Sequence, residues 1–512
     1  MHRAATPPGL GARLTLDPDA TIGAIDRRLF GSFVEHLGRG IYDGIHEPSH
    51  PLADEWGFRT DVLELVRELG VSTIRYPGGN FVSGYRWEDG IGPRHERPTR
   101  LDLAWHSTET NQVGLDEFAA WAERAGADVM LAVNLGTRGV AEALDLLEYT
   151  NIPGGTTWSD ARIAHGRTAP YDVRMWCLGN EMDGPWQLGH RSADDYGKLA
   201  ARTARAMRQL DPSLELVVCG SSSSRMPTFG AWERTVLQHT YDDVDHISCH
   251  AYYELEDDDM GSFLASAVDM DRFIDTVVAT ADQVGAERRS AKRIQISFDE
   301  WNVWYFRRYE EVDKITGTGN WPVAPRLLED TYTVADAVVV GSLLVSLLRH
   351  ADRVTSASMA QLVNVIAPIT TEPGAHAWRQ TTFFPFATTS RLARGSSLDV
   401  AISSSRHVTA ARGEVDVVDA VATWDETTGR SAVFLVNRDE HRPATVTIDV
   451  SRLPVTRVTE CRTLSDDDPF AINTVDDPER VQLIDNTTAE LTDGRVSVVL
   501  PPVSWTALAL AG

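Results

Sequence analysis

Val173–Glu181 reads VRMWCLGNE, a short apolar run that ends in a glycine, an asparagine and a glutamate. The same design recurs at Ile294–Trp301, IQISFDEW, where the run leads into Asp299 and Glu300. Short apolar runs bounded by turn residues predict buried strands. Six further runs have this character: Phe30–His36, Thr73–Gly79, Asp128–Leu135, Glu215–Ser222, His246–Tyr253 and Val354–Leu362.

Amphipathic stretches separate these eight runs. One of them is DEFAAWAERAG at 116–126, whose apolar residues recur at helical spacing. Eight strands that alternate with helices predict an α/β fold, a closed (β/α)₈ TIM barrel. The alternative is an open doubly wound sheet, which is disfavoured because no GxGxxG motif follows the first strand. The apolar run from Val334 to Leu348 is interrupted by Asp336 and is predicted to form a buried helix.

Both ends of the chain have a different pattern. From about Leu392 onward, short β-rich segments alternate with turn residues, which predicts an all-β sandwich, jelly-roll-like in form. The segment RLTLDPDATIGAID at 13–26 has the same character. We therefore expect three parts: strands within residues 1–25 that join the sandwich, a catalytic barrel over 26–391 and the sandwich over 392–512.

The composition limits the possible binding partners and indicates the cellular compartment. Lys and Arg number 48 against 74 Asp and Glu, so the formal charge is −26. A chain this acidic repels phosphate groups, which argues against nucleic acid and against an anionic membrane surface. Cys177, Cys219, Cys249 and Cys461 form no CxxC pair, and the N-terminus shows no apolar signal core. These features predict a cytoplasmic protein without a disulfide scaffold.

Two connections are too long to be simple turns, Asn80–Asn111 and Asn302–Glu329, and both are rich in aromatic residues. Each follows a predicted strand, so both should lie at the C-terminal mouth of the barrel, where active sites sit. Polar residues also end several strands there. They are Glu35, His36, Arg75, Asn80, Asn180, Glu181, His250, Tyr252, Asp299, Glu300 and Gln361.

Glu181 and Glu300 form the most informative pair. The fourth and seventh strands of an eight-stranded barrel face each other across the mouth. Two facing carboxyl groups can divide the roles of acid and nucleophile at a glycosidic bond. Such a pair repels when both members are charged, so one of them holds its proton to higher pH. A structural ion pair is the ordinary alternative for either glutamate alone.

The residues around this pair resemble a known family. GNEMDGPWQLGH around Glu181 and SFDEWNVWY around Glu300 are similar to the active-site segments of the family 51 glycoside hydrolases, the α-L-arabinofuranosidases. The similarity includes TIRYPGGNFVSGYRWEDGIGP at 73–93 and spans the whole barrel. It implies a retaining, exo-acting enzyme that needs no cofactor and no metal. Glu181 would be its acid/base and Glu300 its nucleophile.

The resemblance also implies roles for the neighbouring residues. Glu35, Asn80, Asn180 and Gln361 would line the pocket for the terminal arabinofuranosyl ring. Tyr252 is the right type of group to bind the nucleophile oxygen, and Arg75 could favour ionisation of one carboxyl group. His250 is placed with them as a strand-end residue. Trp105 and Trp304 would give the sugar an apolar face, or else would pack as ordinary core residues.

The sequence also offers alternatives to this function. HEPSH at His46–His50 resembles a metal pair, but Pro48 and Ser49 make it a loop and no third ligand is evident. A binding module without catalysis would be expected to lack one of the two glutamates. A retaining enzyme of other specificity, an endo-β-glucanase or a β-xylosidase, stays open. The expected partner is an arabinose-containing oligosaccharide, and the resemblance implies a homo-oligomer, with a hexamer as one form.

Overall fold

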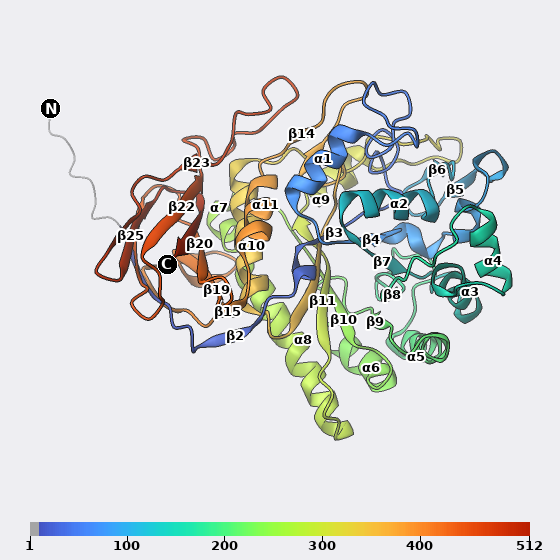
Figure 1. The fold of residues 1–512 in the computed structure, drawn as a ribbon, viewed down its shortest axis with the longest axis horizontal. Coiled ribbons are helices and arrows are strands. Elements are labelled where there is room, and N and C mark those ends of the chain that lie inside the picture. The colour runs from blue at the N-terminus through green and yellow to red at the C-terminus, as the bar shows by residue number, and fades with distance from the viewer. Residues whose placement is uncertain (1–9) are drawn as a thin grey trace.

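The computed structural model describes residues 10–512, so the first nine residues of the predicted N-terminal segment lie outside the described part of the chain. Eight parallel strands close into a barrel at the centre of the molecule, which confirms the predicted fold class (Figure 1). In order around the barrel they are β3 (Gly31–Phe33), β4 (Thr73–Tyr76), β7 (Asp128–Ala132), β8 (Met175–Leu178), β9 (Glu215–Val218), β10 (His246–Tyr253), β11 (Gln295–Val303) and β12 (Val354–Met359). Each lies within or overlaps one of the eight apolar runs.

Helices follow each strand and form the outer layer of the barrel. They are α1 (Thr60–Leu69), α2 (Leu115–Ala125), α3 (Val140–Asn151), α4 (Thr157–Ala164), α5 (Ala193–Leu210), α6 (Ala231–Thr240), α7 (Met260–Leu264), α8 (Ala267–Arg288), α9 (Phe306–Arg308), α10 (Val334–Arg349) and α11 (Phe383–Leu392). Of these, α1 and α2 end at Gly70 and Gly126, which adopt the left-handed conformation that favours glycine after a helix. None of the described helices is both long and apolar enough to span a membrane.

The sandwich consists of two main sheets. One has the order β16-β1-β21-β25-β24 and the other has the order β2-β15-β19-β20-β26-β22-β23. Their bounds are β1 (Leu10–Thr15), β2 (Thr21–Ala24), β15 (Ser396–Leu398), β16 (Ala401–Ser404), β19 (Val418–Asp425), β20 (Arg430–Asn437), β21 (Ala444–Asp449), β22 (Arg457–Leu464), β23 (Ile484–Asp485), β24 (Glu490–Thr492), β25 (Arg495–Leu500) and β26 (Ser504–Ala511).

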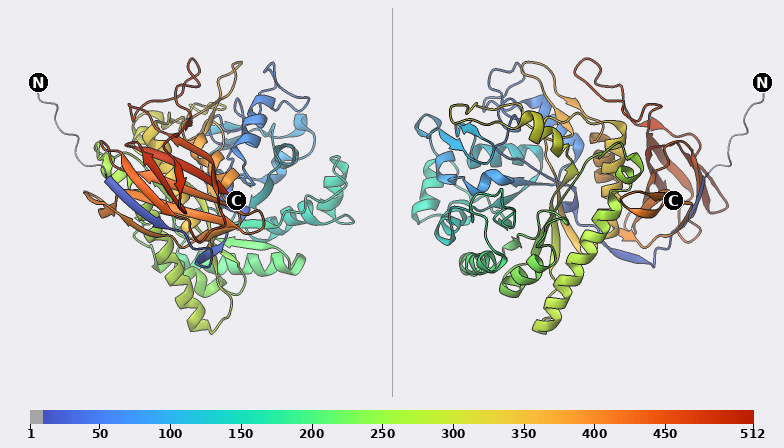
Figure 2. Two further views of the ribbon diagram at one scale, coloured as in Figure 1. Left: turned by 60° about the vertical axis from the view of Figure 1, so that its left-hand side comes forward. Right: turned by 180° about the vertical axis from the view of Figure 1, so that it is seen from behind.

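The N-terminal strand lies among strands from the other end of the chain. β1 pairs antiparallel with β16 and parallel with β21, and in Figure 2 it is the blue strand among orange and red ones. β2 pairs with β15 in the other sheet. These are the pairings expected if the N-terminal segment joins the sandwich. The exact division of the chain at residues 25 and 391 stays a prediction.

Helix α10 joins the barrel to the sandwich. All residues from Val334 to Leu348 are buried, as the apolar run predicted, and Figure 1 shows α10 between the barrel and the sandwich. Gly341 allows this close approach, because an added Cβ would lie 2.2 Å from Cδ1 of Trp505 on β26. Trp505 belongs to the same hydrophobic cluster as the barrel core. The barrel core therefore extends to the facing side of the sandwich, whose interior forms a second cluster of its own.

The two long connections meet over one end of the barrel. The Thr108 N–H donates to the Pro322 carbonyl oxygen at 2.9 Å, and the ring of His106 stacks on Trp321 with centroids 3.7 Å apart. The first connection contains the short hairpin of β5 (Arg100–Asp102) and β6 (Ser107–Glu109). Two further hairpins lie elsewhere: β13 (Ile369–Thr370) with β14 (Trp378–Arg379), and β17 (Arg406–Thr409) with β18 (Gly413–Asp416).

Candidate active site

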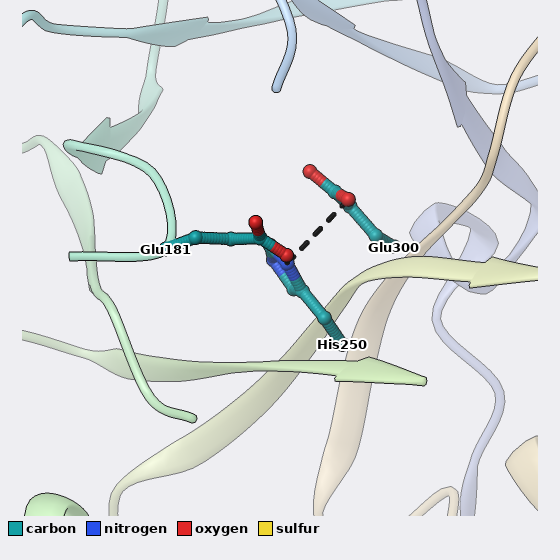
Figure 3. A group of neighbouring side chains, drawn as sticks. All are labelled: Glu181, His250 and Glu300. Carbon is teal, nitrogen blue, oxygen red and sulfur yellow. Dashed lines mark hydrogen bonds and ion pairs between the residues drawn. The ribbon is translucent and has the colours of Figure 1, made fainter. Parts of the chain in front are cut away.

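The structure brings Glu181 and Glu300 together at the mouth of the barrel. Glu181 follows the end of β8, whereas Glu300 lies near the C-terminal end of β11. One carboxylate oxygen of each and one ring nitrogen of His250 all lie within 4.8 Å of one another (Figure 3). Glu181 has a φ of 44°, a left-handed conformation that is strained for a residue with a side chain. The fold thus holds the Glu181 backbone in a strained conformation, with its carboxyl group beside that of Glu300.

Glu300 receives hydrogen bonds on both of its oxygens. Arg75 Nη1 donates to Oε1 at 3.0 Å, and the Tyr252 hydroxyl donates to Oε2 at 2.7 Å. Burial and the neighbouring Glu300 charge hold the pKa of Tyr252 well above its ordinary value, so its hydroxyl keeps the proton that it donates. A charged guanidinium and a hydroxyl on one carboxylate favour the ionised form of that carboxylate. Glu300 thus has a charged donor on one oxygen and a neutral donor on the other.

Arg75 is itself held from several sides. Nη2 donates to Asn180 Oδ1 at 2.5 Å, Nε lies 3.3 Å from Cys177 Sγ, and Asp299 Oδ2 lies 3.8 Å from Nε. Sequence reasoning missed Cys177 and noted Asp299 only as a strand end. Both side chains are buried with Arg75, and no local signal marks a cysteine inside an apolar strand as a contact of an arginine on another strand.

Glu181 also receives a donor on each oxygen. His250 Nδ1 lies 2.9 Å from Oε1, and the Trp186 indole N–H donates to Oε2 at 2.7 Å. The same His250 nitrogen is 3.5 Å from Glu300 Oε2. Burial by itself would lower the pKa of His250, but the Glu300 and Glu181 carboxylates outweigh it and the pKa is raised. Sequence reasoning missed Trp186, although its signal is the tryptophan in the turn five positions beyond the glutamate of GNE.

A second group of predicted residues surrounds Glu35. The Phe81 N–H and the Trp105 indole N–H donate to Glu35 Oε1 at 2.8 and 2.7 Å. The Gln361 amide donates to Oε2 at 3.1 Å, and its oxygen accepts from the Glu35 backbone N–H at 3.3 Å. Burial is the main reason that the pKa of Glu35 is raised to about 8, with the Glu300 charge adding to it. Near neutral pH this carboxyl group can therefore hold a proton inside the pocket.

The raised pKa of Glu35 predicts how stability depends on pH. Between about pH 4.5 and about pH 8 the folded state holds a proton that the unfolded state has lost. The stability contributed by this proton is complete at the acidic end and is lost as the pH rises through about 8. We expect the thermal midpoint of the native protein to fall over this range relative to that of Glu35→Gln, which carries no titrating group. Parallel curves for the two proteins would contradict this assignment.

Asn80 and Trp304 complete the predicted set. Asn180 Nδ2 lies 3.3 Å from Asn80 Oδ1, which connects Asn80 to the Arg75 cluster. The Trp304 ring packs edge-to-face on Tyr252 with centroids 5.1 Å apart, and its buried indole nitrogen has no acceptor among the described residues. Trp105 and Trp304 thus lie beside the polar residues of the mouth.

Glu181, His250 and Glu300 also form the one group of metal-type ligands found within the described residues. The short distances of His250 Nδ1 to both carboxylates suit an N–H donor that occupies the space between them. Their arrangement is therefore that of two carboxyl groups with a histidine N–H between them. His46 and His50 of HEPSH lie instead beside the carbonyl oxygens of Trp56 and Ala375, at 3.2 and 3.1 Å.

Comparison with known proteins identifies the family. The model described as the α-L-arabinofuranosidase 1 domain matches residues 65–288, and the model of the α-L-arabinofuranosidase C-terminal domain matches residues 299–504. An exo-α-(1→6)-L-arabinofuranosidase of Bifidobacterium longum is 58% identical, over 97% of each chain. This chain belongs to the family 51 α-L-arabinofuranosidases. The solved structure of another family 51 α-L-arabinofuranosidase from B. longum is 51% identical, with a TM-score of 0.94, and covers 99% of this chain and 100% of its own.

A further relative supports membership of this arabinofuranosidase family. An intracellular exo-α-(1→5)-L-arabinofuranosidase of Streptomyces lividans is 59% identical, over 98% of this chain and 75% of its own length. The two matched regions of the arabinofuranosidase fold meet at the site, because Glu181 lies in the first and Glu300 in the second. The second region begins within β11, so it contains the end of that strand and the whole of β12 as well as most of the sandwich.

Proposed function

We propose that the protein is a retaining, exo-acting glycoside hydrolase that releases terminal non-reducing α-L-arabinofuranosyl residues from oligosaccharides. The observation that supports it most is the approach of one Glu181 oxygen and one Glu300 oxygen to within 4.8 Å. Carboxyl groups about 5–5.5 Å apart are typical of retaining enzymes, whereas inverting pairs lie about 6.5–9.5 Å apart to admit a water molecule. The family membership supplies the sugar.

In the first step, Glu300 attacks the anomeric carbon and the bond to the leaving oxygen breaks. Glu181 gives its proton to that oxygen, so the leaving group departs as an alcohol. In the second step, Glu181 removes a proton from water, the water oxygen bonds to the anomeric carbon, and Glu300 leaves as a carboxylate. Arg75 and Tyr252 support the anionic form of Glu300 at the start and at the end of the cycle.

The remaining predicted residues suit a single small sugar. Glu35, Asn80, Asn180 and Gln361 offer donors and acceptors for hydroxyl groups, and Asn180 would contact the 2-hydroxyl. Trp105 and Trp304 would cover apolar faces of the ring. The contact between Thr108 and Pro322 joins the two long connections, which supports a pocket for a chain end over an open cleft for a long polymer.

The names of the relatives indicate which part of the substrate can be proposed for this protein. Proteins 59% and 58% identical to this chain are named for (1→5) and (1→6) linkages, so the terminal arabinofuranosyl group is what they share. The relative from S. lividans is named intracellular. We extend this to a cytoplasmic location here, where imported oligosaccharides would be the substrates. A homo-oligomer, for which a hexamer is one form, also belongs to the proposal, and sedimentation would test it.

The stereochemistry of the first product tests the mechanism. We expect NMR spectra recorded during hydrolysis of an aryl α-L-arabinofuranoside to show the α-configured sugar first, with the β form appearing later by mutarotation. A first product of inverted configuration would overturn the retaining mechanism. Aryl β-xyloside and β-glucan, assayed in parallel, address the alternative specificities, and turnover of either at a rate equal to that of the arabinofuranoside would overturn the proposed substrate.

A further inference from the structure

Trp186 occupies an unusual position for a large apolar side chain. It is 54% exposed, yet its indole N–H donates to Oε2 of Glu181 at 2.7 Å. The ring lies directly over the backbone of Gly184, where an added Cβ would come within 2.5 Å of ring atom Cε2. The indole of Trp186 thus packs on the turn after β8, and its N–H edge points at the Glu181 carboxyl group.

The two donors on Glu181 differ in their freedom to move. His250 comes from strand β10 and is 2% exposed, so it stays beside Oε1. Trp186 belongs to a turn and faces solvent, so its contact with Oε2 can be broken and remade. A carboxylate accepts donors readily on both oxygens, but a protonated carboxyl group has one oxygen that donates and accepts poorly. Protonation of Glu181 on Oε2 therefore requires the indole N–H to withdraw.

From this geometry we propose that Trp186 is a positioning residue that binds the carboxylate form of Glu181 and releases it when Oε2 takes up a proton. This inference rests on the proposed acid/base role of Glu181. In the cycle, Oε2 gains a proton from water, gives it to the leaving oxygen and is again a carboxylate, to which the indole N–H returns. Trp186 would thereby favour the base form that the second step needs.

Other charged and titrating groups also face Glu181. His250 and Tyr252 come from β10, Glu300 from β11 and Asp183 from the same turn. Arg75 of β4 donates to Glu300 and not to Glu181. A substitution that removes only the indole N–H leaves all of them in place. Because the indole N–H donates to the carboxylate form of Glu181, its loss should act on Glu181 alone.

Trp186→Phe is the direct test, since it keeps an aromatic ring and removes the N–H. The basic limb of the pH profile of kcat/KM reports the acid of the free enzyme. We expect this limb, measured on 4-nitrophenyl arabinofuranoside, to move up by about one pH unit, as the loss of one charge-assisted hydrogen bond implies. The acidic limb, set by the nucleophile, should stay in place. An unchanged basic limb would overturn the proposal.

Two further variants distinguish the loss of the hydrogen bond from Trp186 to Glu181 from other effects of a tryptophan substitution. Gly184→Ala retains Trp186 but displaces its ring, so it should move the basic limb in the same direction. Trp56→Phe changes an exposed tryptophan outside the site, 46% accessible, and should leave the profile unchanged. A shift in Trp56→Phe equal to that in Trp186→Phe would overturn the specific role of Trp186.

Glu181→Gln distinguishes failure of this inference from failure of the proposed function. If Glu181 is the acid, its replacement removes the basic limb on the same substrate. A basic limb that persists in Glu181→Gln would overturn the acid/base assignment itself. A limb that disappears in Glu181→Gln but does not move in Trp186→Phe would leave the function standing and overturn the role of Trp186.

Discussion

Glu300→Ala is expected to lower kcat/KM by about 10⁴-fold or more on every arabinofuranoside, whatever its leaving group. Without the carboxylate no covalent sugar intermediate can form, and neither Arg75 nor Tyr252, which contact it, can replace it as a nucleophile. Steady-state kinetics on a dinitrophenyl and an alkyl arabinofuranoside would measure the loss. Large losses on both are expected, because every substrate must pass through the covalent intermediate that this carboxylate forms.

Glu300→Gln provides a matched control for Glu300→Ala. The amide has the shape of the carboxylate and can still accept from Tyr252, so it should preserve packing at this buried position. We expect the same loss of activity, with a thermal midpoint closer to that of the native protein than the midpoint of Glu300→Ala. Residual activity within about tenfold of the native enzyme in both variants would show that another group is the nucleophile.

Glu181→Ala is expected to show a loss that depends on the leaving group. A positioned general acid contributes about 10²–10⁴-fold, and it contributes least where the leaving group is already a stable anion. The first step should therefore stay fast on dinitrophenyl arabinofuranoside and become slow on an alkyl or sugar aglycone. The second step lacks its base, so a covalent sugar should accumulate on Glu300 and be visible by mass spectrometry of the intact protein.

Azide provides the positive control for Glu181→Ala. As a small anionic nucleophile it needs no base, and the space left by the missing side chain can admit it. We expect azide to restore turnover of the dinitrophenyl substrate and to release an arabinofuranosyl azide of retained configuration. Equal loss on all leaving groups, together with no rescue by azide, would show that Glu181 is not the acid/base.

Much of the fold follows from local pattern. The eight apolar runs all contain or overlap barrel strands, because a buried parallel strand requires apolar residues on both faces and the chain has few ways to meet that requirement. The apolar run at Val334–Leu348 likewise forms the buried helix α10. The pairing of β1 between β16 and β21 was predictable only as membership of the sandwich, since the local pattern of a short strand does not specify its neighbours.

The C-terminal ends of the predicted strands indicated where the functional side chains would lie. The contacts in the structure show how these side chains are arranged. The eleven residues with predicted catalytic or sugar-binding roles converge at the mouth around the Glu181–Glu300 pair and around Glu35, with Trp304 packed on Tyr252. The strand-end residue His36 lies apart from them, bonded to Glu109 and Tyr76. The roles of the eleven residues stay predictions until the variants are measured. Trp186 and Cys177 could not be found in the same way, because neither ends a strand.

By itself the sequence determined the barrel, the β-rich ends and the placement of Glu181 and Glu300 at the C-terminal ends of two barrel strands. Each of these depends on hydrophobic periodicity or on position relative to a strand end, which are local properties of the chain. Only the tertiary structure decided which group contacts which oxygen: Arg75 and Tyr252 on Glu300, His250 and Trp186 on Glu181. These contacts join residues on different strands and turns, and the geometry that selects them exists only after the barrel has closed.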